Sequence, residues 1–268
     1  MIKKTLIAAT LALLAAGTAQ PAQADATFLE PYGNTFTARP LLALPGDTRP
    51  TDAFTGQASR VEDPTQRLFV SPFFRIASFP GLGGRDIDVS QYGAGIGYAN
   101  TTARFPFLVT ASFFNTNIDV DGLGDDNAFS FDVTGKIVLW NPSPNLPVAS
   151  IVGRFQNYDD IGQRYDVLLA LDQRVTRDVF LTANLGYASF DPEFFQSQED
   201  FVARFGATWR ASQRLSFSFD YTLDNDVDGE DFWTLSGTWA ANESIAVRFG
   251  GGKHETFFGN LIWKTDWR

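Results

Sequence analysis

Three aspartates alternate with other residues and precede a glycine in the segment Asp224-Asn225-Asp226-Val227-Asp228-Gly229. The first half of an EF-hand loop offers oxygen ligands to calcium at this spacing and turns sharply on its glycine. The last ligand position of such a loop would be Leu235, where an EF-hand has a bidentate glutamate. Asp224, Asp226 and Asp228 are therefore candidate ligands of a weak Ca²⁺ site, and a solvated acidic turn is the alternative.

Enzyme chemistry has few candidate residues in this chain. The only histidine is His254, in Gly252-Lys253-His254-Glu255, and there is no cysteine. A hydrolase triad needs a serine or cysteine beside its histidine, and no serine lies near His254 in the sequence. The pair Asp159-Asp160 could serve general acid–base chemistry, but adjacent surface carboxylates are common. We therefore expect a protein that is not an enzyme and that carries no cofactor besides the possible Ca²⁺.

The elements that carry these residues are predicted to be β-strands. From Gln66 to the end, apolar and polar residues alternate, as in Phe129-Ser130-Phe131-Asp132-Val133. A period of two is typical of a strand with one apolar and one polar face. We mark about twelve strands of about nine to thirteen residues, while weak segments such as 245–252 leave roughly ten to fourteen open.

The connections between these strands alternate in length. Short turns are expected at 100–102, 176–178, 211–213 and 242–244, with a stretched one at 141–147. Longer links are expected at 79–86, 118–127, 159–163, 191–199, 225–231 and 252–255. Alternating short and long connections predict an all-β, antiparallel up-and-down barrel with both chain ends on the short-turn side.

Large aromatic residues are sorted by strand end. Those near the short-turn ends are Tyr98, Trp140, Trp209, Trp239 and Trp263. Tyr187, Tyr221 and Trp233 lie toward the opposite ends. A lipid interface favours aromatic girdles at both rims of a barrel, so this sorting predicts membrane insertion. The alternative is that these rings fill the core of a soluble β-sandwich.

The N-terminal quarter of the chain differs from the rest. Lys3 and Lys4, the apolar stretch 6–19 and Ala22-Gln23-Ala24 predict a cleaved signal peptide over 1–24, with a retained anchor as the alternative. Residues 25–64 are rich in proline and are predicted to be a flexible arm that could enter or cover the barrel of 65–268. No later window approaches about 18 consecutive apolar residues.

With these features, the chain over residues 66–268 resembles bacterial outer-membrane β-barrels. Its last strand is similar to their sorting signal, with Phe257, Leu261, Trp263 and Trp267 on one face, but it ends on Arg268 instead of an aromatic residue. The resemblance implies a location in the bacterial outer membrane, with the lipid bilayer, lipopolysaccharide and the barrel-assembly machinery as partners. The net charge of −10 argues against nucleic acid as a partner.

Charged residues on the polar parity of the strands would line the lumen. The basic ones are Arg67, Arg75, Arg104, Lys136, Arg154, Arg164, Arg174, Arg204, Arg210, Arg248 and Lys264. The acidic ones are Asp132, Asp166, Asp172 and Asp220, with Asp200 and Asp224 near the rim.

This excess of bases predicts a net-basic lumen that attracts anions. We expect a small channel or porin for anionic or polar small solutes, similar to the small-barrel channels that pass acidic sugars. A closed, salt-bridged barrel with a structural, adhesion or surface-interaction role is the alternative, because long Arg and Lys side chains can cross a narrow lumen. An outer-membrane enzyme is a third alternative.

Overall fold

The computed structural model describes residues 66–80, 86–100, 105, 107–120, 124–140, 147–159, 162–176, 178–192, 198–212, 215–224, 232–241, 245–253 and 255–266. The predicted signal peptide, 1–24, and the predicted arm, 25–64, lie outside these residues. Within the described residues, no helix is both long and apolar enough to cross a membrane.

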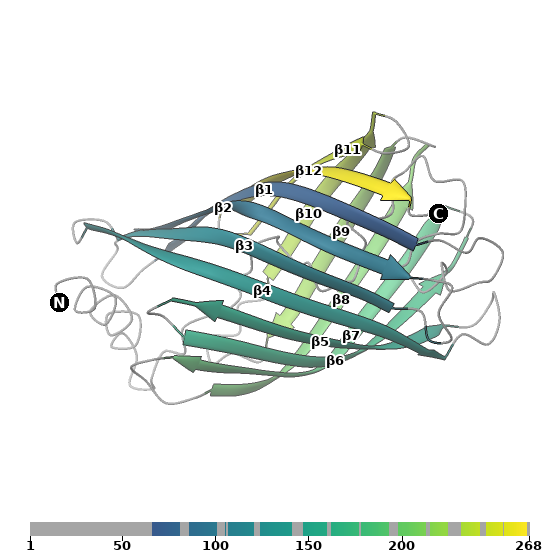
Figure 1. Cartoon of the computed structure of the whole chain (residues 1–268), viewed down its shortest axis with the longest axis horizontal. Coiled ribbons are helices and arrows are strands. Elements are labelled where there is room, and N and C mark those ends of the chain that lie inside the picture. The colour runs from purple at the N-terminus through teal and green to yellow at the C-terminus, as the bar shows by residue number, and fades with distance from the viewer. Residues whose placement is uncertain are drawn as a thin grey trace.

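The described chain folds into twelve antiparallel strands (Figure 1). Their bounds are β1 Gln66–Pro80, β2 Asp86–Asn100, β3 Phe107–Val120, β4 Gly124–Trp140, β5 Val148–Tyr158, β6 Gly162–Arg174, β7 Val179–Pro192, β8 Gln198–Arg210, β9 Leu215–Asp224, β10 Phe232–Ala240, β11 Ile245–Gly252 and β12 Phe257–Asp266. Each strand pairs with its neighbours in sequence, and β1 also pairs with β12. The predicted closed up-and-down barrel is therefore confirmed.

The alternation of side chains decides which face of each strand lines the interior. In β5, inward Val148, Val152 and Arg154 are buried, while outward Ile151 is exposed to the surroundings of the barrel. A strand places successive side chains on opposite faces, so one parity of each strand must line the lumen and the other the outer wall. Figure 1 shows that the strands are tilted relative to the axis of the barrel, as closure of a sheet into a barrel requires.

Four of the six predicted long links are shorter than expected, and the short turn predicted at 100–102 spans 101–106, so the connections do not alternate clearly in length. The link predicted at 118–127 is mostly strand, since β3 runs to Val120 and β4 starts at Gly124, with Asp119 opposite Asp125. Backbone hydrogen bonding continues there although the apolar alternation has ended, because strand pairing joins backbone groups whatever the polarity of the side chains. The link predicted at 252–255 has its expected length, since β11 ends at Gly252 and β12 starts at Phe257. The Gly252 N–H donates to Thr256 O at 2.9 Å, and Glu255 has a φ of 49°.

The seam that closes the barrel is interrupted in the middle of β1. Pairing between β1 and β12 runs to Val70↔Trp263 and resumes at Phe73↔Asn260, whereas β1 and β2 pair without a break. Pro72 lies in this gap and has no N–H to donate to β12. A side-chain hydrogen bond from Asn260 Nδ2 to Ser71 Oγ, 3.1 Å long, joins the two strands beside it.

Substituting Pro72→Val is expected to raise the free energy of unfolding by about 1 kcal/mol, because it adds one backbone hydrogen bond at the seam. Urea unfolding of the barrel in lipid vesicles would measure this change. Ala94→Val on β2 is the control, since it adds a β-branched residue on the outer face directly opposite Pro72 without adding a donor. Equal gains from both variants would contradict a role of the missing N–H.

Candidate functional site: the barrel interior

The structure places most of the predicted lumen residues inside the barrel. Arg75, Lys136, Arg154 and Arg248 are buried on inward positions, as are Asp132, Asp166 and Asp220. Arg67 and Arg204 belong to β1 and β8, with side chains outside the described set, and Arg104 lies wholly outside it. The interior of the described part therefore carries charges of both signs.

One group of charges joins β4, β5 and β6. Arg154 on β5 is central: its Nε donates to Asp132 Oδ2 on β4, and its Nη1 lies 4.0 Å from Asp166 Oδ2 on β6. Asp166 Oδ1 accepts a hydrogen bond of 2.9 Å from Arg164 Nε. Thr134 Oγ1 also donates to Asp132, at 3.3 Å. Two bases and two acids are thus placed alternately on one wall of the lumen.

A second ion pair lies nearer the short-turn end of the same wall. Lys136 Nζ on β4 is 2.6 Å from Asp172 Oδ2 on β6, across the intervening strand β5. Asp172 Oδ1 accepts a hydrogen bond of 2.8 Å from Thr182 Oγ1 on β7. Both charged side chains are almost completely buried. A charge withdrawn from water needs such partners, because an isolated one would cost several kcal/mol of free energy or more.

The wall formed by β9 to β12 holds a further base and a further acid, while Arg75 lies on β1. Arg248 on β11 donates from Nε and Nη2 to Ser236 Oγ at 3.1 and 3.0 Å, and its Nη2 lies 3.9 Å from Asp220 Oδ2. Its guanidinium carbon is 5.5 Å from the centre of the Phe258 ring, a cation–π distance. Each inward acid that the structure describes therefore lies within 4.0 Å of a base.

An aromatic layer inside the barrel was not predicted from the sequence. Phe73, Phe114 and Tyr158 project inward from β1, β3 and β5 and are at most 5% exposed. Ring centres are 5.9 Å apart for Phe73 and Phe114, and 6.1 Å apart for Phe114 and Tyr158. All three lie in one row of paired residues, because Phe73 pairs with Gly93, Gly93 with Phe114, Phe114 with Ser130 and Ser130 with Tyr158.

Pairs of adjacent phenylalanines in the sequence could have indicated that some aromatic rings point into the barrel. Each of Phe73-Phe74, Phe113-Phe114 and Phe257-Phe258 breaks the alternation of apolar and polar residues. In each doublet one ring is buried inside the barrel and the other lies on the outer face, as with Phe114 at 1% and Phe113 at 53% exposure. Two adjacent strand residues cannot share a face, so every such doublet in a membrane barrel must place one ring in the lumen.

Gly93 allows this layer to form. A Cβ built on Gly93 would lie 2.6 Å from Phe114 Cα and in collision with Phe113 O. The substitution Gly93→Ala is therefore expected to lower the free energy of unfolding by about 1–3 kcal/mol, as overpacking does. Gly153 is the matched control, because a Cβ there would meet nothing within 4 Å. Gly153→Ala should raise the free energy of unfolding by about 0.5–1 kcal/mol, and similar losses from both variants would contradict the steric explanation.

The predicted aromatic girdle lies on the outer face near the short-turn ends. Trp140, Trp209, Trp239 and Trp263 are all about half exposed on the barrel surface, while Tyr98 is less exposed and packs 6.0 Å from the Phe107 ring centre. Tyr92, Tyr187 and Trp233 lie on the outer face of the other half, and Tyr92 Oη accepts a 2.9 Å hydrogen bond from Asn115 Nδ2.

The candidate calcium ligands fall largely outside the described residues. Asp224 ends β9, and the side chain of Asp224 and the whole of Asp226, Asp228 and His254 are not among those that the structure describes. Within the described residues, no three His, Cys, Asp or Glu side chains lie close enough together to hold a metal ion.

Comparison with known proteins supports the fold. The sequence matches no family model and no curated protein. Among solved structures, the translocator domain of autotransporter NalP from Neisseria meningitidis has 10% sequence identity and a TM-score of 0.57, over 80% of this chain and 92% of that one. An outer-membrane channel from Pseudomonas putida F1 has 9% identity and the same TM-score, over 78% of this chain and 98% of that one. The described chain is thus a twelve-stranded β-barrel of the bacterial outer-membrane type.

Proposed function

We propose that this protein is an integral barrel of the bacterial outer membrane that passes small polar solutes through its interior. A polar, charged inner wall inside a closed apolar outer wall is the observation that carries the proposal. An aqueous path across hydrocarbon requires this distribution, since water must find hydrogen-bonding groups inside and lipid must find none outside.

The outer wall supports membrane insertion. Outward apolar side chains are exposed on every strand, for example Val167 at 63% and Phe129 at 57%. Such an apolar surface in water would cost about 25 cal/mol for each Å². Hydrocarbon removes this cost, and the half-exposed tryptophans near the short-turn ends suit the polar edge of a bilayer.

The inner wall supports a hydrated path. The side-chain amides of Gln156 on β5 and Asn184 on β7 are fully buried, and neither has a hydrogen-bond partner among the described residues. Buried amide groups almost always make hydrogen bonds to protein or to water. Water or the polar groups of a solute can supply these bonds at both residues.

Anions are the solute class that we propose. Inward charges in the described part are five bases, Arg75, Lys136, Arg154, Arg164 and Arg248, against four acids, Asp132, Asp166, Asp172 and Asp220. The sequence predicts further inward bases at Arg67, Arg104 and Arg204. A surplus of bases on a low-dielectric wall raises the local concentration of anions.

Reconstitution of the purified chain in planar lipid bilayers tests the proposal. We expect discrete conductance steps, and in a salt gradient a reversal potential of the sign given by anion flow. A folded barrel that gives no steps would contradict channel function. Conductance steps that prefer cations would support channel function but contradict the proposal that the solutes are anions.

A closed barrel with a structural or surface-interaction role is the second candidate. It is favoured by the aromatic layer of Phe73, Phe114 and Tyr158 and by the ion pairs of the inner wall, which are buried in the described structure. As partners we propose the bilayer and lipopolysaccharide, and the assembly machinery during biogenesis. Weak Ca²⁺ binding at Asp224, Asp226 and Asp228 stays a prediction, which calorimetry with calcium on the folded protein would test.

A further inference from the structure

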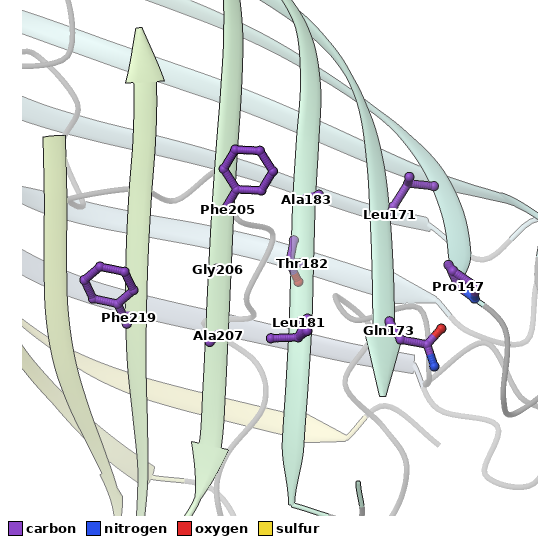
Figure 2. Close-up of a pocket in the computed structure, with 10 residues that line it drawn as sticks. All are labelled: Pro147, Leu171, Gln173, Leu181, Thr182, Ala183, Phe205, Gly206, Ala207 and Phe219. Carbon is purple, nitrogen blue, oxygen red and sulfur yellow. The ribbon is translucent and has the colours of Figure 1, made fainter. Parts of the chain in front are cut away.

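A groove crosses the outer wall in the half of the barrel that contains the short turns. It has a volume of about 430 Å³ and is lined from β6, β7, β8 and β9, with Pro147 at one end (Figure 2). Most of its lining residues lie on the outward parity of their strands, so the groove opens away from the lumen. Gln173 contributes the single side-chain amide of the lining, and Figure 2 shows it on the same side as Pro147.

The groove arises from the placement of small residues in two adjacent rows. In one row, Ala183 on β7 lies between Leu171 and Phe205, its partners on β6 and β8. In the next row toward the short turns, Ala207 on β8 lies between Leu181 on β7 and Phe219 on β9. The two alanines are diagonal neighbours, so the wall has a continuous furrow that passes between the side chains of Leu181 and Phe205.

We propose that this groove holds one acyl chain of a phospholipid from the leaflet at the short-turn side of the membrane. The inference rests on the proposed insertion in the outer membrane. An apolar furrow suits an alkyl chain, because its walls contact the chain on more sides than a smooth lipid-facing wall does and so add dispersion attraction.

The position of the groove argues for this leaflet. Trp209, a residue of the aromatic girdle, lies two positions beyond Ala207 on β8 toward the short turn, and it is 55% exposed. Aromatic girdles mark the level of the lipid headgroups. The groove therefore starts just inside the headgroup level, and the amide of Gln173 lies at the end where a glycerol ester or phosphate oxygen would be.

Native mass spectrometry of the full chain in a non-ionic detergent, titrated with palmitoyl-oleoyl phosphatidylethanolamine, tests the proposal. We expect one lipid to bind before the others. The double substitution Ala183→Leu/Ala207→Leu fills the furrow with side chains that suit a lipid-facing strand, and it should weaken binding of this lipid about tenfold, the effect of losing roughly ten van der Waals contacts between atoms.

The control is Ala94→Leu/Ala111→Leu, the same two changes at outward positions of β2 and β3, which line no part of the groove. It should bind the first lipid as the unsubstituted chain does. Equal lipid binding by the groove variant and the control would overturn the proposal. A preference for lipopolysaccharide that the groove variant abolishes would overturn the assignment to a phospholipid, and a dimer that it abolishes would show a second copy in the groove.

Two further measurements separate this inference from the proposed function. Folding of each variant is checked by its heat-modifiable mobility on gels, so loss of lipid is not mistaken for loss of the barrel. Conductance in planar bilayers reports on the lumen alone and should be the same for the groove variant and the control. A barrel that binds the lipid but does not conduct would contradict the proposed channel function and would still support the lipid site.

Discussion

Replacing Arg154 with methionine is expected to lower the free energy of unfolding of the barrel by about 3–5 kcal/mol, the usual effect of removing one partner of a buried ion pair. Arg154 donates to Asp132 and lies 4.0 Å from Asp166, and all three side chains are almost completely buried. Methionine fills much of the same space but leaves both carboxylates without this guanidinium. Urea unfolding in lipid vesicles would measure the loss.

Gln156 provides a matched control two residues further along β5. It is inward and fully buried like Arg154, but its side chain forms no ion pair and has no hydrogen-bond partner among the described residues. Gln156→Met should leave the free energy of unfolding unchanged or raise it. Adding Asp132→Asn to Arg154→Met should recover part of the lost stability, because it removes one uncompensated charge. A loss from Gln156→Met as large as from Arg154→Met would mean that polarity in general, and not this ion pair, stabilises the wall.

Replacing Phe114 with alanine is expected to increase the single-channel conductance several-fold. Phe114 is central in the aromatic layer, with contacts to both Phe73 and Tyr158, and is 1% exposed. Apolar constrictions resist hydration, so removal of the central ring should widen the lumen and wet it. The same change costs about 3–5 kcal/mol of folding free energy, as expected for a buried phenylalanine. Phe114→Leu is the milder variant for conductance if the alanine variant does not fold.

Phe113→Ala is the control, since Phe113 precedes Phe114 on the same strand but lies on the outer face with 53% exposure. It removes a ring from the lipid surface and should leave the conductance unchanged. If Phe113→Ala and Phe114→Ala change the conductance alike, or if Phe114→Ala does not change it, the layer does not limit flow. If neither the parent chain nor Phe114→Ala conducts, the closed-barrel candidate is favoured.

Prediction of the fold succeeded because its signal is local. Alternation in segments such as 129–137 needs only neighbouring residues, and the lengths of turns need only the positions of strand ends. The alternation of side chains was visible in the sequence, and the twelve strands and their up-and-down order agree with it. The predicted alternation of link lengths was wrong, since the link after β2 spans 101–106 and the link after β3 only 121–123. Predicted ends were less accurate at 118–127, since hydrogen bonding between β3 and β4 continues through polar residues such as Asn117 and Asn127 that carry no apolar alternation.

Prediction of the interior was less complete because pairing depends on neighbours across strands. Parity was enough to place Arg154, Asp132 and Asp166 inside, but their contact depends on the register of β4, β5 and β6. Phe73 and Phe114 were not recognised as lumen residues, since apolar residues were assigned to the outer face. In the doublets that contain them, the position along the strand, and not the residue type, decides which face a side chain occupies. Applying this rule to the sequence would have placed one ring of each doublet in the lumen.

By itself the sequence determined the barrel, its antiparallel order and the two faces of its wall, because all three follow from a period of two along the chain. Only the tertiary structure decided which inward charges meet, that Phe73, Phe114 and Tyr158 form one layer, and that Ala183 and Ala207 form a furrow. These features bring together residues from different strands at the same level of the barrel. The stagger between strands that aligns them is set by backbone hydrogen bonds around the closed sheet, and it cannot be read from the sequence of a single strand.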